Sequence, residues 1–242
     1  MTYCVGISLE QGMLFASDSR TNAGVDQVSK FSKMRVFEVP GDRVIVIINS
    51  GNLSITQNTL NVLQQTINHP RPDGRHLLNV TSMFDAAALV GEAMREVQSR
   101  ETPFLAGIDA SANYIVGGQI RGEAPRLFMV YSQGNSIESS LETCFFQIGE
   151  TKYGKPIIDR VVNRQTTLVD AAKCILISFD ATMRSNISVG LPIDMLVYET
   201  DSFRVKAQHK IDEDNNYYLQ VHHQWSQGLR ELFHKLPNPD WL

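Results

Sequence analysis

The chain has 242 residues, of which 43% are hydrophobic and 20% charged, and its formal net charge is −4. These proportions are those of a globular protein and exclude a fibrous or disordered chain. The acidic balance argues against a nucleic-acid partner, because binding phosphates requires a clustered basic excess. The apolar runs are too short to cross a bilayer and the start lacks a signal-peptide pattern, so we expect a cytoplasmic protein without a membrane partner.

The cysteines and histidines give no sign of a metal site. Cys4, Cys144 and Cys174 are odd in number and form no CxxC pair, which suits a reducing compartment and core packing. His222 and His223 are adjacent on a predicted helix, where their side chains point apart, so we expect them to be solvated or packed. We therefore expect neither a metal nor a cofactor.

The first part of the chain predicts strands in succession, followed by a pair of helices. Alternating residues and short apolar runs predict the strands, and apolar residues at helical spacing predict the helices. Phe84 falls on the apolar side of the second helix. The predicted strands are 3–9, 13–17, 34–39 and 44–48, and the predicted helices are 53–67 and 83–97.

The rest of the chain repeats this arrangement of strands in runs and helices in pairs. Val169 falls on the apolar side of helix 168–183, and Trp225, Leu229, Leu232 and Phe233 form a stripe on the last helix, for which packing within the chain is the default and an interface the alternative. The predicted strands are 114–120, 127–131, 144–148, 193–198 and 203–209, and the predicted helices are 153–162, 168–183 and 217–236.

This order favours antiparallel sheets covered by helices over a βαβ winding. We therefore expect an α+β fold. No break in composition marks a boundary, so we expect residues 1–242 to form a single domain.

Thr2 is the first candidate for chemistry. A threonine hydroxyl is a poor nucleophile unless a base takes its proton, and the α-amine of an N-terminal threonine can do so within one residue. The small residue after Met1 suits removal of that methionine, so we expect Thr2 to become the N-terminus.

A charged pair is expected beside Thr2. Asp18 ends the second predicted strand, and a hairpin returns that end to the start of the first strand, next to Thr2. Lys33 starts the third strand at the same end of the sheet, where its ammonium would lower the pKa of the Thr2 hydroxyl. Lys30 is the competing candidate, and Lys33 is preferred because the apolar strand follows it directly.

Backbone donors for an oxyanion are expected at Gly51. The turn 50–52 lies between a strand and a helix N-terminus, where backbone N–H groups are free to bind an anion. An ordinary strand-to-helix turn is the alternative.

These residues together carry a resemblance. The chain is similar to proteasome β subunits and their bacterial HslV relatives in Thr2, in the segment Ala16-Ser17-Asp18-Ser19-Arg20 with Thr21 and Gly24, in Lys33 opening the third strand, and in the Ser50-Gly51 turn. The amino-acid sequence of residues 2–6 and 18–26 most resembles that of the bacterial Anbu group, the ancestral β subunit. The similarity covers nearly the whole chain, and residues 2–38 are its most specific part.

The resemblance implies the four-layer αββα sandwich of an Ntn hydrolase. It also implies Thr2 as the nucleophile, Asp18 and Lys33 as the charged pair, and Gly51 as the oxyanion donor. The supporting residues near the amine fall at Ser185 and Ser188. Ser185 stands where proteasome subunits usually have an aspartate, and Glu150 stands near the place of another supporting serine.

The function implied is that of a threonine endopeptidase in a self-compartmentalising homo-oligomer, either a ring or a helical assembly, acting on peptides or proteins. Two alternatives stay open. The same groups serve any acyl transfer, so an amidase or acylase acting on a small amide is one. A weakly active or inactive assembly subunit is the other.

Overall fold

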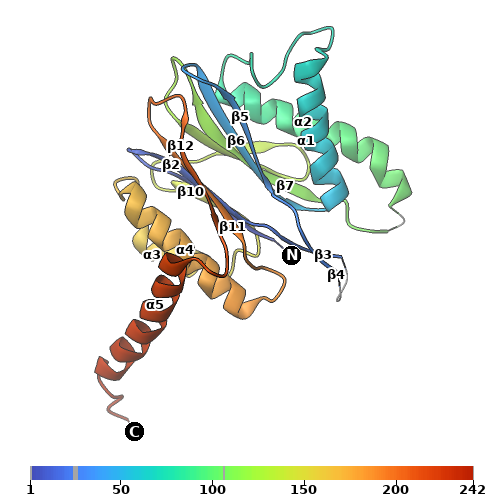
Figure 1. Cartoon of the computed structure of the whole chain (residues 1–242). Helices are drawn as coiled ribbons and strands as arrows, with labels where there is room; N and C mark the ends of the chain where they lie inside the picture. Colours follow the sequence, from blue (N-terminus) through green and yellow to red (C-terminus); the bar gives the residue numbers. More distant parts are fainter. Residues whose placement is uncertain (1, 24–26, 106, 242) are drawn as a thin grey trace.

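The computed structural model describes residues 2–23, 27–105 and 107–241, and Met1 and residues 24–26 of the resemblance lie outside this range. Two five-stranded antiparallel sheets lie face to face, with helices on the outer side of each (Figure 1). The structure confirms the expected α+β fold of two antiparallel sheets flanked by helices. In the part of the chain described, no helix combines the length and the apolar character that a membrane span requires.

The first sheet contains the N-terminal hairpin at its centre. In spatial order its strands are β10 (Phe145–Gly149), β1 (Tyr3–Ser8), β2 (Gly12–Asp18), β11 (Ile193–Glu199) and β12 (Val205–Ile211). The pairing places Cys4 opposite Ser17 and Ile193 opposite Asp18. The start of β1 and the end of β2 therefore meet at one end of the sheet, as the hairpin predicts.

The second sheet consists of strands that are neighbours in sequence, and a short hairpin joins the two sheets. The strands of this sheet are β5 (Met34–Val39), β6 (Arg43–Gly51), β7 (Ala112–Ile120), β8 (Arg126–Val130) and β9 (Ser136–Glu138), and the separate hairpin is formed by β3 (Arg20–Ala23) and β4 (Gln27–Lys30). β3, β4 and β9 are not among the predicted strands.

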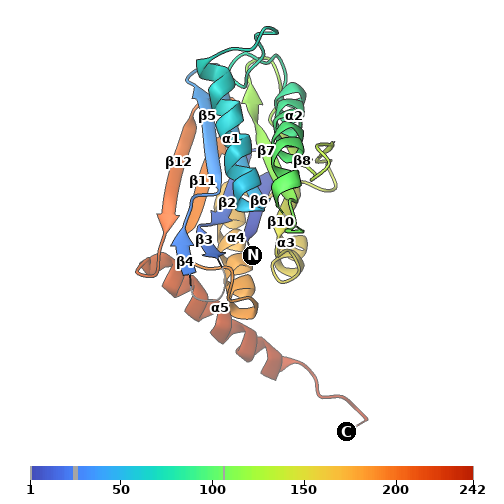
Figure 2. The same cartoon turned by 90° about the vertical axis from the view of Figure 1, so that its right-hand side faces the viewer.

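The helices form the two outer layers, and the last one projects from the body (Figure 2). α1 and α2 pack on the second sheet, α3 and α4 pack on the first, and α5 contacts α4. Their bounds are α1 (Leu53–Asn68), α2 (Met83–Glu101), α3 (Lys155–Val161), α4 (Leu168–Ser185) and α5 (Asn216–Lys235), with a 3₁₀ turn η1 (Thr102–Phe104) after α2.

Side-chain caps define where the longer helices begin. Asn52 accepts hydrogen bonds from the first-turn N–H groups of α1, and Ser82 and Thr167 do the same for α2 and α4. These bonds satisfy donors that have no partner within the helix. Because β6 ends at Gly51 and Asn52 caps α1, the Gly51 backbone is joined directly to the start of this helix.

Three apolar clusters hold the layers together, one between the sheets and one under each pair of helices. Strand β1 belongs to two of them. Tyr3, Val5 and Ile7 face α3 and α4, whereas Cys4 faces the second sheet. Because successive strand residues point to opposite faces, Thr2 falls on the same side as Cys4, at the open end of the space between the sheets.

Several predicted bounds differ from the structure, and local features explain two of these differences. The predicted helix 153–162 begins only at Lys155, where Gly154 is the N-cap and Pro156 occupies the first turn, a position in which its missing N–H costs no helical hydrogen bond. The last strand begins at Val205 instead of residue 203, because Asp201 and Phe203 have positive φ angles of 62° and 44° and form a turn.

Candidate functional site

An ion pair joins the end of β2 to the residue before β5. Lys33 Nζ lies 3.1 Å from Asp18 Oδ1, and both side chains are buried. The same oxygen accepts a hydrogen bond of 3.0 Å from the backbone N–H of Tyr3. Asp18 therefore contacts Tyr3, the residue that directly follows Thr2. The β1–β2 hairpin brings the end of β2 to the start of β1.

Burial raises the pKa of the Asp18 carboxyl above its ordinary value, while the Lys33 charge and the Tyr3 N–H act in the opposite direction. The second carboxylate oxygen, Oδ2, is buried and has no hydrogen-bond partner among the described residues. Asp18 is thus a poorly solvated anion whose principal counter-ion is Lys33.

The Lys33 ammonium is surrounded by oxygen atoms. Besides Asp18 Oδ1, its Nζ donates to the backbone oxygens of Asp18, at 3.0 Å, and Arg20, at 2.5 Å. Three acceptors match the three N–H bonds of an ammonium. The geometry therefore describes a charged, immobile lysine. Lys30, the other candidate, lies exposed on β4.

The backbone of Lys33 is held from the second sheet. Its carbonyl oxygen accepts from the backbone N–H of Asn49 at 3.1 Å and from the Asn49 side-chain amide at 2.9 Å. Asn49 lies two residues before Gly51 on β6. The Lys33 backbone is therefore hydrogen-bonded to the strand, β6, that ends at the expected oxyanion turn.

Gly51 occupies a backbone conformation that glycine alone adopts readily. Its φ is +113°, and a Cβ at this position would overlap the carbonyl oxygen of Ser111. The next residue, Asn52, caps α1 through its side chain. The structure thus places Gly51 at a strand-to-helix junction, as expected.

Thr2 is half-buried, and its carbonyl oxygen accepts a 2.7 Å hydrogen bond from the backbone N–H of Glu150. The Gly149 turn allows this contact, because a Cβ there would overlap the same oxygen. The Glu150 carboxylate is buried and accepts from the Asn186 amide at 2.8 Å. Glu150 therefore connects Thr2 to the segment that follows α4.

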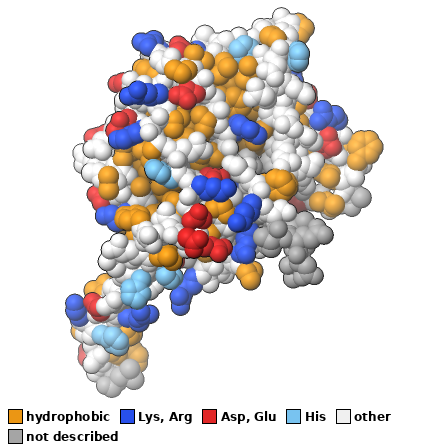
Figure 3. All heavy atoms as spheres, viewed as in Figure 1, with side chains coloured by type: hydrophobic (Ala, Val, Ile, Leu, Met, Phe, Trp, Pro, Cys, Tyr) orange, Lys and Arg blue, Asp and Glu red, His pale blue; other side chains and the backbone are white. Residues whose placement is uncertain are grey.

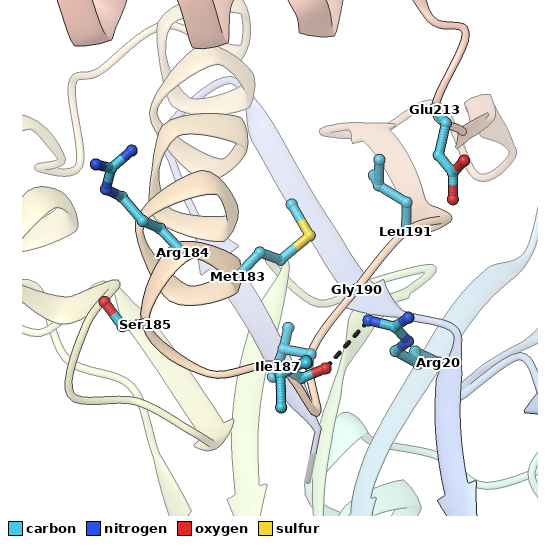
Figure 4. A pocket seen from close by; sticks show the side chains of 9 residues that line it. Arg20, Met183, Arg184, Ser185, Ile187, Gly190, Leu191 and Glu213 are labelled. Carbon is cyan, nitrogen blue, oxygen red and sulfur yellow. Dashed lines mark hydrogen bonds between the residues drawn. The ribbon is translucent and has the colours of Figure 1, made fainter. Parts of the chain in front are cut away.

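Ser185 and Ser188 lie in or next to that segment. Ser185 ends α4 and is exposed, and it lines a cavity of about 630 Å³ together with Arg20. Figure 4 shows Ser185 across the cavity from Arg20, whose guanidinium donates to the carbonyl oxygen of Ile187 at 3.1 Å. Ser188 is half-buried, and its N–H donates to Asn186 Oδ1 at 2.9 Å. Neither serine contacts Thr2 through a hydrogen bond within the described structure.

A second cavity, of about 360 Å³, adjoins the Lys33 side of the site. Residues 31–33 and residues of β5, β6 and α1 form its wall. Its lining residues are Phe31, Ser32, Lys33, Arg35, Asn49, Leu53, Thr56, Gln57, Leu60 and Asn61.

The hydrogen-bonded supports of the site were not identified from the sequence. Asn49, Asn186 and Asp194 each bind a site segment through a side chain. The signal that was available is a polar residue at the end of a buried strand, as at Asn49 after five apolar residues. No group of histidine, cysteine, aspartate and glutamate side chains that could hold a metal occurs in residues 2–23, 27–105 and 107–241.

Comparison with solved structures decides the family. No protein-family model and no curated protein matches the chain. The Anbu protein of Yersinia bercovieri is 47% identical, with 98% of each chain covered and a TM-score of 0.92. This chain belongs to the Anbu family. The Anbu complex of Pseudomonas aeruginosa, solved as a helical assembly, is 46% identical over 98% of each chain, with a TM-score of 0.93.

A third Anbu structure, from Hyphomicrobium sp. strain MC1, is 43% identical over 98% of this chain and 99% of that one, with a TM-score of 0.92. Anbu denotes the ancestral β subunit. The chain is therefore a proteasome-like subunit with the Ntn-hydrolase fold, and the resemblance expected from the sequence is confirmed.

Proposed function

We propose that this Anbu subunit is a threonine peptidase that hydrolyses peptide bonds with Thr2 as its N-terminal nucleophile. The observation that carries the proposal is the buried ion pair of Lys33 and Asp18, whose shared oxygen also holds the N–H of Tyr3. A buried cation next to the first residues of β1 stabilises the negative charge that develops on the Thr2 hydroxyl as it loses its proton during attack.

Each group has a role in the proposed reaction. Removal of Met1 frees the α-amine of Thr2, which takes the proton of the Thr2 hydroxyl as that oxygen attacks the scissile carbonyl carbon. Lys33 stabilises the developing negative charge, and Asp18 keeps Lys33 in place. The Gly51 N–H donates to the oxyanion, and the protonated amine then delivers its proton to the leaving amine. Water hydrolyses the resulting ester.

Ser185 and Ser188 enter this proposal as polar groups that support the Thr2 amine. Ser185 ends α4, and Ser188 belongs to the α4–β11 connection that follows it. Arg20 and Glu150 bind this connection through Ile187 and Asn186.

The same proposal includes self-assembly and location. The Pseudomonas aeruginosa relative forms a helical assembly, and we infer that this chain also associates with copies of itself. The three cysteines are buried and unpaired, which suits a reducing compartment such as the cytoplasm.

The test is hydrolysis by the purified chain with a mass that shows Thr2 at its N-terminus. Fluorogenic peptides and small-molecule amides are assayed in parallel, with Thr2→Ala as the matched control. We expect cleavage of peptides, abolished in Thr2→Ala. Cleavage of the amides alone would establish an amidase instead, and equal activity of Thr2→Ala would exclude Thr2 as the nucleophile.

A further inference from the structure

A second buried carboxylate, Asp194, lies beside the proposed site without contacting the ion pair. It is the second residue of β11, opposite Ser17 of β2, and is 9% exposed. Its Oδ2 accepts hydrogen bonds from two serine hydroxyls, Ser19 at 2.9 Å and Ser32 at 3.0 Å. One oxygen thus joins three segments of the chain: β11, the β2–β3 connection and the residue before Lys33.

The places of the two serines in the chain give these bonds a consequence. Ser19 lies between Asp18 and Arg20, the two residues whose backbone oxygens accept from Lys33 Nζ. Ser32 directly precedes Lys33 in the chain. The Asp194 carboxylate therefore fixes both the acceptors of the lysine and the backbone from which the lysine extends.

We propose that Asp194 is a positioning residue, which holds Lys33 in its cage of oxygen atoms through Ser19 and Ser32. Other contacts restrain the same two segments as well. Asn49 binds the Lys33 carbonyl oxygen. The Ser32 hydroxyl also lies 3.3 Å from the Met34 carbonyl oxygen. The Ser19 N–H donates to Pro192 O, and the Phe31 N–H donates to Ser19 O, both at 2.9 Å. The backbone hydrogen bonds of Ser19 and Phe31 align the segments with each other. The bonds to Asp194 are charge-assisted and bring both serine hydroxyls to the same carboxylate oxygen, Oδ2.

The effect on function follows from the sensitivity of catalysis to position. A displacement of about 1 Å in a catalytic group costs on the order of a hundredfold in rate. The expected effect of Asp194 on kcat rests on the proposed function. Its effect on the Lys33 side chain needs no activity at all, so the two can be tested separately.

The first experiment measures the accessibility of Lys33. Wild type and Asp194→Ala are treated with an acetylating reagent, and the acetylation rate of each lysine is mapped by mass spectrometry. We expect the rate at Lys33 to rise at least about tenfold in Asp194→Ala, while exposed Lys30 reacts equally in both proteins and serves as the internal reference. Equal protection of Lys33 in both proteins would overturn the proposal.

The second experiment measures peptide hydrolysis. We expect Asp194→Ala to lower kcat at least about tenfold with KM within about twofold. Asp194→Asn, whose amide oxygen can still accept from both hydroxyls, should recover most of that loss. A loss in Asp194→Asn as large as in Asp194→Ala would contradict a role through Ser19 and Ser32.

Serine variants provide the matched control. Ser19 and Ser8 are 2% and 1% exposed, and the Ser8 hydroxyl accepts from Arg164 at 3.0 Å at the far end of β1. We expect Ser19→Ala to lower kcat and Ser8→Ala to leave it unchanged. A larger loss in Ser8→Ala would show a general effect of stability. If wild type cleaves no peptide but Lys33 becomes reactive in Asp194→Ala, the proposed function fails and the positioning role stands.

Discussion

The Lys33 ammonium contacts three oxygen atoms, two of which belong to Asp18 and one to Arg20. Replacing Lys33 by Ala removes the only proposed cation beside Thr2. We expect Lys33→Ala, and likewise Asp18→Asn, to lower kcat by at least about two orders of magnitude, because the developing negative charge then lacks a fixed partner. The measurement is steady-state peptide hydrolysis, with folding checked by circular dichroism.

Lys30→Ala is the control, since Lys30 is an exposed lysine three residues earlier in the chain. It should retain the kcat of the wild type. Normal turnover in Lys33→Ala together with loss of activity in Lys30→Ala would show that the proposed role belongs to Lys30.

The buried position of Asp18 predicts a dependence of stability on pH. Its pKa in the folded protein is raised by burial, above the value of about 3.9 for an exposed aspartate. As the pH rises between these two values, the unfolded state releases its proton first. The contribution of Asp18 to the free energy of unfolding is therefore complete below about pH 4 and is lost as the pH rises through the folded pKa.

Urea denaturation of wild type and Asp18→Asn at a series of pH values measures this effect. We expect the free energy of unfolding of wild type, relative to the variant, to fall as the pH rises above about 4. A relative free energy that rises instead would mean that Lys33 lowers the pKa of Asp18 more than burial raises it.

The junction between β6 and α1 depends on Gly51. Its φ of +113° is unfavourable for any other residue, and an added Cβ would overlap Ser111 O. Strain and overlap together predict a loss of roughly 2–6 kcal/mol in the free energy of unfolding of Gly51→Ala. Gly74, with a φ of +67°, is the control, because a Cβ there has no atom within 4 Å.

Gly74→Ala should lose about 1 kcal/mol, the cost of a left-handed backbone alone. Thermal denaturation of both variants distinguishes the two cases. Equal losses in Gly51→Ala and Gly74→Ala would show that the contact with Ser111 does not restrict this junction.

Strands and helices were predictable wherever the apolar pattern was strong, and less so elsewhere. The hairpin β3–β4 was missed because residues 20–30 are mainly polar and lack a strand-like alternation. Phe84 and Val169 were wrongly placed on apolar faces, since both are exposed in the structure. Helical spacing leaves the buried face uncertain by about one residue, and packing on the sheet decides it: Met83, Ala86 and Val90 are buried on α2.

The candidate site was predictable to the extent that one hairpin determines it. The pairing of β1 with β2 brings Asp18 to Tyr3, and β5 then brings Lys33 to the same end. The hydrogen bonds of Asn49 and Asp194 depend on how the two sheets and the connections between them meet, and no local pattern contains that information. The catalytic roles of all six site residues stay predictions, as does the single domain over residues 1–242; the six are Thr2, Asp18, Lys33, Gly51, Ser185 and Ser188.

The C-terminal helix gives the whole molecule an uneven outline. Tyr218 is buried against α4, and His222 Nδ1 lies 2.5 Å from Asp180 Oδ1, so the first turns of α5 are attached to the body. Beyond them the helix projects, and Figure 3 shows hydrophobic side chains among basic ones and histidines on this projection. The expectation that its stripe packs within the chain is wrong for Leu229, Leu232 and Phe233, which are exposed.

These exposed residues predict a surface for self-association. Apolar residues at positions 229, 232 and 233 share one face of α5, and exposed Leu236 follows at its C-cap. Such a face is stabilised when a second copy covers it. We expect Leu232→Glu to shift the assembled protein toward smaller species in analytical ultracentrifugation. Leu141→Glu, at a 79% exposed leucine in a loop, should leave the assembly unchanged. Assembly of Leu232→Glu as large as that of wild type would exclude this surface.

The central claim is that the hydroxyl and α-amine of Thr2 act together on an acyl group. A peptide epoxyketone reports both, because closing a ring on one residue requires the hydroxyl and the free amine. Intact mass and peptide mapping after reaction should show one adduct per chain, on Thr2, with partial reaction in Thr2→Ser and none in Thr2→Ala. An adduct on Cys4, Cys144 or Cys174 with Thr2 unmodified would contradict the account.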